Sequence, residues 1–590
     1  MDRNPRGSSA IAIVGIAFRF PARLHTLDEL WEVLTKGSDV TGPLPDARRA
    51  LLGDRCALAE FAGGYLEGIE RFDAPFFGMN GREARLCDPQ QRILLETTWH
   101  ALEDAAIVPD SLRGSATGVF VGAHTCDYQP LALAAGVEAD AYWNAGLNTS
   151  MLANRISYTF DLAGPSFTVN TACSSGLEAL VLGTSMLREG RCETAIVGGV
   201  NVILAAEIAQ SAKRAGMLSP EGRCRPFDDG ADGFVRGEGV AVAVLRPLEQ
   251  ALADGAPIHG VIRAAVSAHG GRGASLVSPQ LDRQSDLIVA AHRQRGDDAA
   301  FVQVVEAHGT GTRLGDAVEL DAIAQALRLI EPDRSAPVSV SSVKGNLGHL
   351  ESVAGLAGVV RILAAFRREE LSPTAHFERC NRLARIGDTP LRIQDRIEAW
   401  PAVDGIRTAG VSSFGFGGSI AHVILDSSPA TSPRTPEHGR KRCLVLLSAR
   451  DQDRLIALAA SWLDWIKSSA LSEEFDRDLL QDLAWTSVHG RARLPHRAGF
   501  VVSAGEELRQ GLKELIATRG SASNLETPWL WNQPALEGSD QEDVESEREQ
   551  VMSWLEDPTN LELPTSISSG QLTHQLPRYS FSPLEYWLGR

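Results

Sequence analysis

Residues 166–180 read SFTVNTACSSGLEAL, and this stretch joins a strand pattern to a helix pattern across a single thiol. The β-prone run ends at Asn170, and the helical pattern starts just after Cys173. The predicted turn places Cys173 near the unpaired N–H groups and the positive end of a helix, which lower the pKa of a thiol. Small residues at 172 and 174–176 leave room for a substrate. We therefore expect a nucleophilic cysteine, with a buried structural cysteine as the alternative.

On both sides of this turn, short apolar runs alternate with helical patterns up to about residue 426. The runs lie at residues 10–18, 118–122, 194–203, 240–245, 261–267, 302–306, 338–343 and 421–425. The helical patterns lie at residues 90–106, 177–187, 284–294 and 353–366. Such alternation predicts a layered α/β fold with largely buried strands.

The composition changes after residue 426. Residues 427–442 are rich in Ser, Pro, Thr and Arg and predict a linker. Residues 443–575 predict a small α/β subdomain, within which residues 538–550 are acidic and are expected to be exposed or partly disordered. The tail, residues 576–590, contains four aromatic side chains and is expected to pack back on a folded surface.

Composition and charge exclude several classes of protein. The 590 residues are 44% hydrophobic and 22% charged, which is typical of a globular chain. The net charge of −18 argues against nucleic-acid binding, and the sequence contains neither a membrane-spanning apolar run nor a secretory signal. The eight cysteines form no CxxC pair, as expected for a reducing compartment. We expect a cytoplasmic enzyme without a metal site.

Three further segments carry residues suited to catalysis. Residues 306–320 (EAHGTGTRLGDAVEL) place His308 where a strand enters a Gly/Thr loop. Residues 341–358 place Lys344 and His349 around a glycine turn before a helix. Residues 411–423 (VSSFGFGGSIAHV) contain glycines that let backbone N–H groups approach a ligand, as in an oxyanion hole. Taken singly, each of these histidines is more often structural than catalytic, and the glycine segment is equally consistent with a plain turn.

The four segments in this order resemble the ketosynthase (β-ketoacyl synthase) domains of modular polyketide synthases, members of the thiolase-like superfamily. The resemblance runs from residue 11 to about 426. It is also carried by AIVGIAFRFP (12–21), DPQQRILLE (88–96), ANRISY (153–158), GPS (164–166) and FDDGADGFVRGEG (227–239). It implies a thiolase-like fold of two similar halves in α-β-α-β-α layers, with a small α/β flanking subdomain.

The resemblance also implies roles for individual residues. Cys173 matches the family's nucleophile, His308 and His349 match its two histidines, and Lys344 matches its lysine. The matching acids are Asp316 and Glu319, of which Glu319 is implied to pair with Lys344. The oxyanion hole is implied to use the N–H groups of Cys173 and Phe416, with Phe416 as a gate. The chain departs from the family at Asn170, Gly176 and Ile420, where Asp, Ser and Asn respectively are common.

The implied reaction is decarboxylative Claisen condensation of a Cys-bound acyl chain with malonyl-acyl carrier protein. A ketosynthase that only transfers acyl chains is one alternative, although such domains typically lack the histidine that matches His308. A non-catalytic scaffold for carrier docking or dimerisation is another. No intrinsic cofactor is implied, because the substrates travel on carrier phosphopantetheine.

The partners implied are upstream and downstream acyl carrier proteins, which are usually acidic, so we expect a local Arg/Lys patch at the pocket entrance. A homodimer is also implied, without nucleic acid or membrane. Residues 447–463, 482–491 and 576–588 resemble the flanking subdomain and the linker that follows an acyltransferase. No GHSxG acyltransferase motif lies between them, so we expect an acyltransferase acting in trans and suspect an excised part of a larger polypeptide.

Overall fold

The computed structural model describes residues 10–53, 56–296, 301–429, 442–468, 477–518, 529–532, 549, 551–552, 555–556, 572–573 and 576–588. Most of the predicted linker, residues 430–441, and most of the acidic stretch at 538–550 lie outside these ranges. No helix in the described ranges is both long and apolar enough to cross a lipid bilayer.

A mixed sheet organises the first 427 residues. Its strands follow the order β13-β11-β10-β15-β16-β9-β1-β8-β6-β4-β5. On one side of the centre lie β1 (Ile11–Arg19), β8 (Gly239–Pro247), β6 (Thr194–Asn201), β4 (Thr117–Ala123) and β5 (Ser166–Val169). On the other lie β9 (Gly260–His269), β16 (Ser419–Ser427), β15 (Thr408–Phe414), β10 (Val304–Glu306), β11 (Val338–Ser341) and β13 (Leu391–Ile393).

The two sides of the sheet repeat one pattern of pairing. Strand β1 is antiparallel to β8, and β8 is antiparallel to β6, whereas β6, β4 and β5 are parallel. Strand β9 is likewise antiparallel to β16, and β16 to β15, whereas β15, β10 and β11 are parallel. The halves meet where β1 pairs with β9. This repetition confirms the predicted thiolase-like fold of two similar halves.

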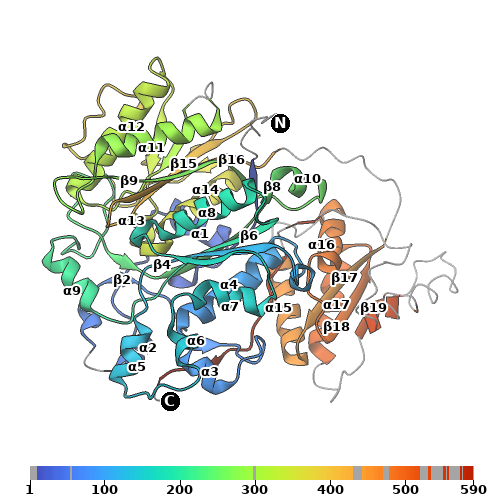
Figure 1. Cartoon of the computed structure of the whole chain (residues 1–590). Coiled ribbons are helices and arrows are strands. Elements are labelled where there is room, and N and C mark those ends of the chain that lie inside the picture. The colour runs from blue at the N-terminus through green and yellow to red at the C-terminus, as the bar shows by residue number, and fades with distance from the viewer. Residues whose placement is uncertain are drawn as a thin grey trace, which may run out of the picture.

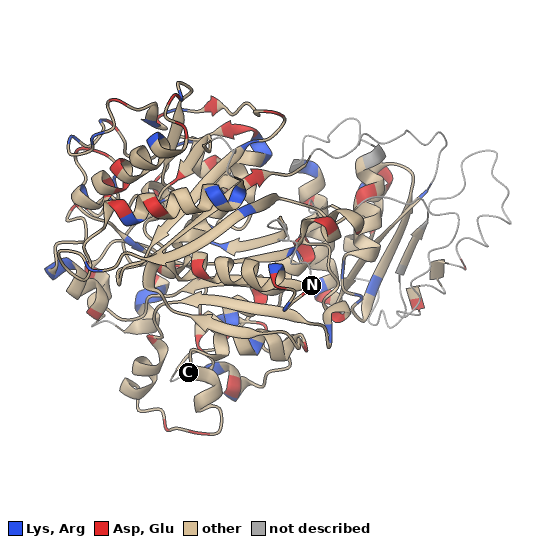
Figure 2. Ribbon diagram, turned by 45° about the horizontal axis from the view of Figure 1, so that its top comes forward, with Lys and Arg blue, Asp and Glu red and all other residues tan. Residues whose placement is uncertain are grey.

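Helices complete the layers (Figure 1). Helices α8 (Ser175–Arg188) and α14 (Ala354–Arg368) pack on each other between the two halves of the sheet. Helix α4 (Pro89–Asp104) covers β1 and β8, and α11 (Leu281–Arg295) packs on β9, β16 and α12 (Arg313–Ile330). The buried strands and the four predicted helices agree with the sequence pattern to within a few residues. Acidic and basic residues are interspersed along the ribbon (Figure 2).

A smaller α/β unit follows. Strands β17 (Cys443–Ala449), β18 (His496–Val502) and β19 (Trp529–Asn532) form its sheet, with β17 antiparallel and β19 parallel to β18. Its helices are α15 (Gln452–Ser468), α16 (Arg477–His489) and α17 (Gly505–Ala517). Helix α15 buries one apolar face, from Leu455 to Ile466.

The tail lies against the larger domain. Strand β20 (Leu584–Glu585) pairs with β3 (Arg71–Phe72), and the guanidinium of Arg92 donates to the carbonyl of Tyr586 at 2.8 Å. The N–H of Tyr579 donates to Glu103 at 2.8 Å. The ring of Trp587 is 4% exposed. The aromatic side chains of the tail are thus covered by the domain on which they lie.

Candidate active site

Cys173 lies in a turn between strand β5 and helix α8, as the sequence predicted. A single 3-10 turn, Ala172–Ser174, links the two elements, and Ala172 adopts a left-handed conformation with φ 56°. The serine side chains stabilise this turn, since Ser175 Oγ accepts from the N–H of Thr171 at 2.9 Å. The turn presents the thiol at the amino end of α8.

The glycine-rich turn between β15 and β16 lies directly against the Cys173 turn. A Cβ on Gly415 would come within 2.1 Å of the Thr171 carbonyl, so no larger residue fits there. Ser413 Oγ donates to the Cys173 carbonyl at 2.9 Å. This close approach brings the N–H of Phe416 into hydrogen-bonding contact with the thiol of Cys173.

The electrostatic environment of the thiol differs from the sequence prediction. Burial raises the pKa of Cys173 to about 12, and the negative charge of Glu351 adds to this effect. Lys344, the Phe416 N–H and Arg236 act in the opposite direction without compensating for it. The predicted lowering of this pKa is therefore wrong. Burial of the thiol raises its pKa by more than the positive end of helix α8 lowers it. The thiol is protonated in the resting protein.

Each of the two imidazoles accepts a hydrogen bond from a backbone N–H at its Nδ1 atom. The N–H of Phe414 donates to Nδ1 of His308 at 3.4 Å, and the N–H of Glu351 donates to Nδ1 of His349 at 3.2 Å. Burial, followed by the charge of Lys344, lowers the pKa of both rings well below the usual value. A neutral imidazole whose Nδ1 accepts carries its hydrogen on Nε2. Both rings therefore have an Nε2–H available to a ligand.

The acidic residues support the loop that carries His308. The two carboxylate oxygens of Glu319 accept from the N–H groups of His308 and Gly309, at 2.7 and 2.8 Å. Asp316 accepts from the N–H of Gly311 at 3.1 Å. Burial raises the pKa of both carboxyls to about 7.

Lys344 is 3% exposed, and burial lowers its pKa. The charges of Glu306 and Glu319 act against that lowering, with Glu306 the larger of the two effects. The implied pairing of Glu319 with Lys344 is thus a longer-range charge interaction, while the hydrogen bonds of Glu319 go to the backbone.

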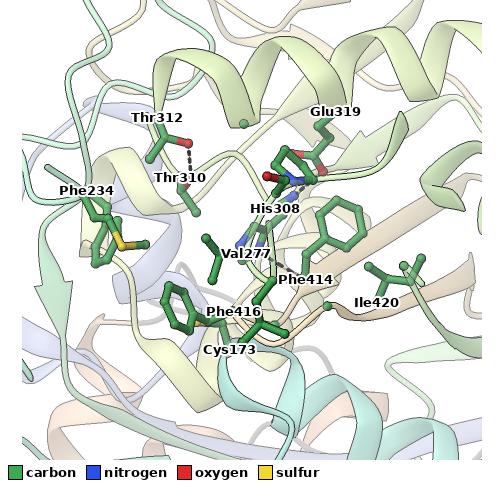
Figure 3. A pocket seen from close by; sticks show the side chains of 18 of the residues that line it. Cys173, Phe234, Val277, His308, Thr310, Thr312, Glu319, Phe414, Phe416 and Ile420 are labelled. Carbon is green, nitrogen blue, oxygen red and sulfur yellow. Dashed lines mark hydrogen bonds between the residues drawn. The ribbon is translucent and has the colours of Figure 1, made fainter. Parts of the chain in front are cut away.

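These residues surround one cavity of about 480 Å³ (Figure 3). Its wall includes Cys173, His308, His349, Asp316, Glu319 and Phe416. Much of the remaining wall is apolar and comprises Ile208, Met217, Phe234, Leu276, Val277, Phe414 and Ile420. Phe416 is 51% exposed, and Figure 3 shows its ring close to Cys173. Lys344 is buried and is not among the residues that line the cavity.

Sequence reasoning missed two charged or polar groups of this wall. Glu351 lines the cavity and forms a buried ion pair with Arg236. Glu351 could have been found from the sequence, because it lies two residues after His349. His124 also lines the cavity, immediately after the carboxyl end of β4. Among the residues that the structure describes, no group of three or more His, Cys, Asp or Glu side chains could hold a metal ion.

Three sequence families match the chain. Residues 8–251 match the β-ketoacyl synthase N-terminal domain, residues 259–378 its C-terminal domain, and residues 382–502 the ketoacyl-synthetase C-terminal extension. Similar curated proteins include polyketide synthase ThaG of Burkholderia thailandensis, 39% identical over 87% of this chain, and polyketide synthase PksN of Bacillus subtilis, 35% identical over 99%. The chain spans only 9% and 11% of these relatives.

Solved structures of single domains match over their whole length. The oxazolomycin ketosynthase domain OzmH KS7 of Streptomyces albus is 33% identical, with a TM-score of 0.83 over 98% of this chain and 99% of that one. The ketosynthase from module 6 of the bacillaene synthase of Bacillus subtilis is 30% identical, with a TM-score of 0.81 over 98% and 100%.

Proposed function

This chain belongs to the β-ketoacyl synthase family as a ketosynthase domain of the polyketide synthase type, and we propose that it catalyses decarboxylative Claisen condensation. One observation carries the assignment: a thiol and two neutral imidazoles, each imidazole with Nδ1 occupied by a backbone N–H, line the same cavity. That arrangement suits a covalent acyl intermediate and a developing negative oxygen.

In the first half-reaction, Cys173 takes the acyl chain. Its sulfur attacks the thioester carbonyl of an acyl-phosphopantetheine, and the carrier thiolate leaves. The proton lost by Cys173 passes to this thiolate. The N–H groups of Cys173 and Phe416 form the oxyanion hole, which is supported by the contact of the Phe416 N–H with the sulfur.

In the second half-reaction, a malonyl thioester loses carbon dioxide and the resulting enolate attacks the Cys173 thioester. We assign the Nε2–H groups of His308 and His349 to the enolate oxygen, which they stabilise by hydrogen bonding. Burial, followed by the charge of Lys344, keeps both imidazoles neutral, and Glu319 fixes the backbone at His308. Asp316 holds the same loop.

The partners are proposed on the same basis. Upstream and downstream acyl carrier proteins deliver the two substrates on phosphopantetheine, so the domain needs no cofactor of its own. Basic residues at the rim suit acidic carriers: Arg283 lines the cavity, and Lys213 and Arg214 end helix α9 (Glu207–Arg214), which lines it with Ile208 and Ser211. An acyltransferase acting in trans is supported by the absence of a GHSxG motif between residues 505 and 576.

We propose that residues 1–426 form the catalytic domain, 427–442 a linker, 443–575 a flanking subdomain, and 576–590 a tail that packs back on the catalytic domain. A homodimer is supported by strand β5, which ends the sheet among the described residues and on which Phe167 is 44% exposed. The test of the function is acylation of Cys173, followed by intact mass, and then release of carbon dioxide and formation of a β-ketoacyl product after addition of malonyl-carrier.

A further inference from the structure

The cavity contains a third imidazole, for which the proposed reaction has no use. His124 follows the carboxyl end of β4 and lines the wall together with Cys173 and His349. Its Nδ1 is buried and has no hydrogen-bond partner. A buried polar nitrogen without a partner costs stability, and a ligand atom that bonds to it recovers that cost.

Asn170 connects His124 to the turn that carries the nucleophile. The amide of Asn170 donates to the carbonyl of His124 at 3.1 Å, and its Oδ1 accepts from the N–H of Ala172 at 3.1 Å. Only an amide can make both bonds, because a carboxylate has no hydrogen to donate. The backbone at His124 is therefore linked to the turn that carries Cys173, and His124 lies near enough to His349 to contribute to the lowering of its pKa.

This placement limits which part of a substrate His124 can meet. The carbonyl carbon of a loaded acyl chain is bonded to the sulfur of Cys173, and its oxygen occupies the proposed hole at the Phe416 N–H. The β-carbon lies two bonds further along the chain. The wall beyond is largely apolar and suits hydrocarbon. His124, linked to the turn of Cys173 through Asn170, is a partner for a polar substituent near the thioester.

We infer that His124 hydrogen-bonds the β-hydroxyl group of the acyl chain carried by Cys173, so that the domain prefers β-hydroxyacyl substrates. A hydroxyl both donates and accepts, so it matches the imidazole in either tautomer. This inference rests on the proposed function, since it requires acylation of Cys173.

The experiment measures loading of the full chain by S-(3-hydroxybutyryl)-pantetheine, as separate enantiomers, and by S-butyryl-pantetheine, with intact mass as the readout. The quantity compared is the ratio of the two loading rate constants. The wild type is expected to favour one hydroxyl enantiomer about fivefold, the effect of one net hydrogen bond. The substitution His124→Leu should bring this ratio to about one, and His124→Gln, which keeps a donor and an acceptor, should restore it.

Two further variants locate the effect. Asn170→Asp, which removes the bond to the His124 carbonyl, should lower the ratio even if His124→Leu does not fold. Gln284→Leu is the matched control, because Gln284 lines the same cavity and also has a buried oxygen without a partner. It should leave the ratio unchanged.

The outcomes separate this inference from the proposed function. A wild-type ratio of one, a ratio that survives both His124→Leu and Asn170→Asp, or a ratio abolished by Gln284→Leu would each overturn the role of His124 while leaving the ketosynthase assignment intact. A wild-type protein that loads neither mimic would overturn both.

Discussion

The rings of His308 and His349 meet almost at right angles, with an interplanar angle of 83° and their centres 5.4 Å apart. Because a backbone N–H occupies Nδ1 in each ring, the two Nε2–H groups are the donors left for a substrate oxygen. Two donors converging on one oxygen stabilise negative charge better than one, and burial strengthens both. The pair is therefore suited to an enolate.

Substitution of His308 should separate loading from elongation. In His308→Ala, one donor to the enolate oxygen is lost while Cys173 and the Phe416 N–H remain, so acyl loading should continue. Decarboxylation and product formation should fall by at least about a hundredfold, as for removal of one oxyanion donor. Intact mass measures loading, and release of carbon dioxide from malonyl-carrier measures the second step. Elongation at the wild-type rate would contradict the assigned role.

The acyl group should be carried by a single sulfur. Cys173→Ala should abolish the mass increase of one acyl group on incubation with an acyl-pantetheine thioester. Cys380 is the matched control, because it is also a partly buried free thiol but does not line the cavity. Cys380→Ala should load one acyl group as the wild type does. An acylated Cys173→Ala protein would place the nucleophile elsewhere.

Alkylation of Cys173 should increase steeply with pH. Because the pKa of Cys173 is raised to about 12, the reactive thiolate is the minor form near neutrality, and its fraction grows about tenfold per pH unit. Iodoacetamide labelling of Cys173, followed by peptide mass spectrometry, should rise across roughly pH 7 to 9 without a plateau. In Glu351→Gln, which removes a charge that raises this pKa, labelling at a given pH should be faster. A plateau near pH 7 would show a lowered pKa instead.

The turn at Cys173 and its pKa show what a sequence pattern can and cannot predict. The strand, the helix and the cysteine between them were predictable because period and propensity act locally. The sign of the pKa shift was not, since it depends on how much of the thiol the rest of the chain covers and on Glu351, 178 residues away along the chain. A local sequence pattern predicts the position of a residue in its helix or strand. The desolvation of its side chain depends on the residues that surround it in the folded pocket.

Glu319 and His124 make contacts that the sequence pattern could not predict. The family resemblance indicated that Glu319 belongs to the site, yet its hydrogen bonds go to the backbone at residues 308 and 309. His124 was not singled out, because a lone histidine after a strand has no spacing that connects it to Cys173. The Asn170 side chain, bonded to both segments, makes that connection.

The aromatic tail should contribute to stability. Trp587 is 4% exposed, and its Nε1–H donates to the carbonyl of Leu51 at 3.1 Å. Trp587→Ala should destabilise the domain by about 3 kcal/mol through lost burial and the cavity left behind. Leu584→Ala is the control on the same tail, because Leu584 is 55% exposed and should change stability little. Thermal unfolding followed by near-UV circular dichroism measures both, and equal melting temperatures for the two variants would show that the tail is not anchored.

The open edge of the sheet should pair with a second copy of the chain. Strand β5 ends the sheet, so on that side its backbone N–H and C=O groups face no further strand of the described residues. Phe167 is 44% exposed on this strand, and Tyr158 on the neighbouring helix α7 (Met151–Thr159) is 86% exposed. Exposed aromatics beside an unpaired strand are typical of an association surface.

We expect sedimentation of the wild type as a dimer and of Phe167→Glu as a monomer. Leu329→Glu is the matched control, since Leu329 is 64% exposed on α12, which packs on α11 rather than on β5, and this variant should remain dimeric. A Phe167→Glu protein that stays dimeric, or a Leu329→Glu protein that dissociates, would place the interface on another face.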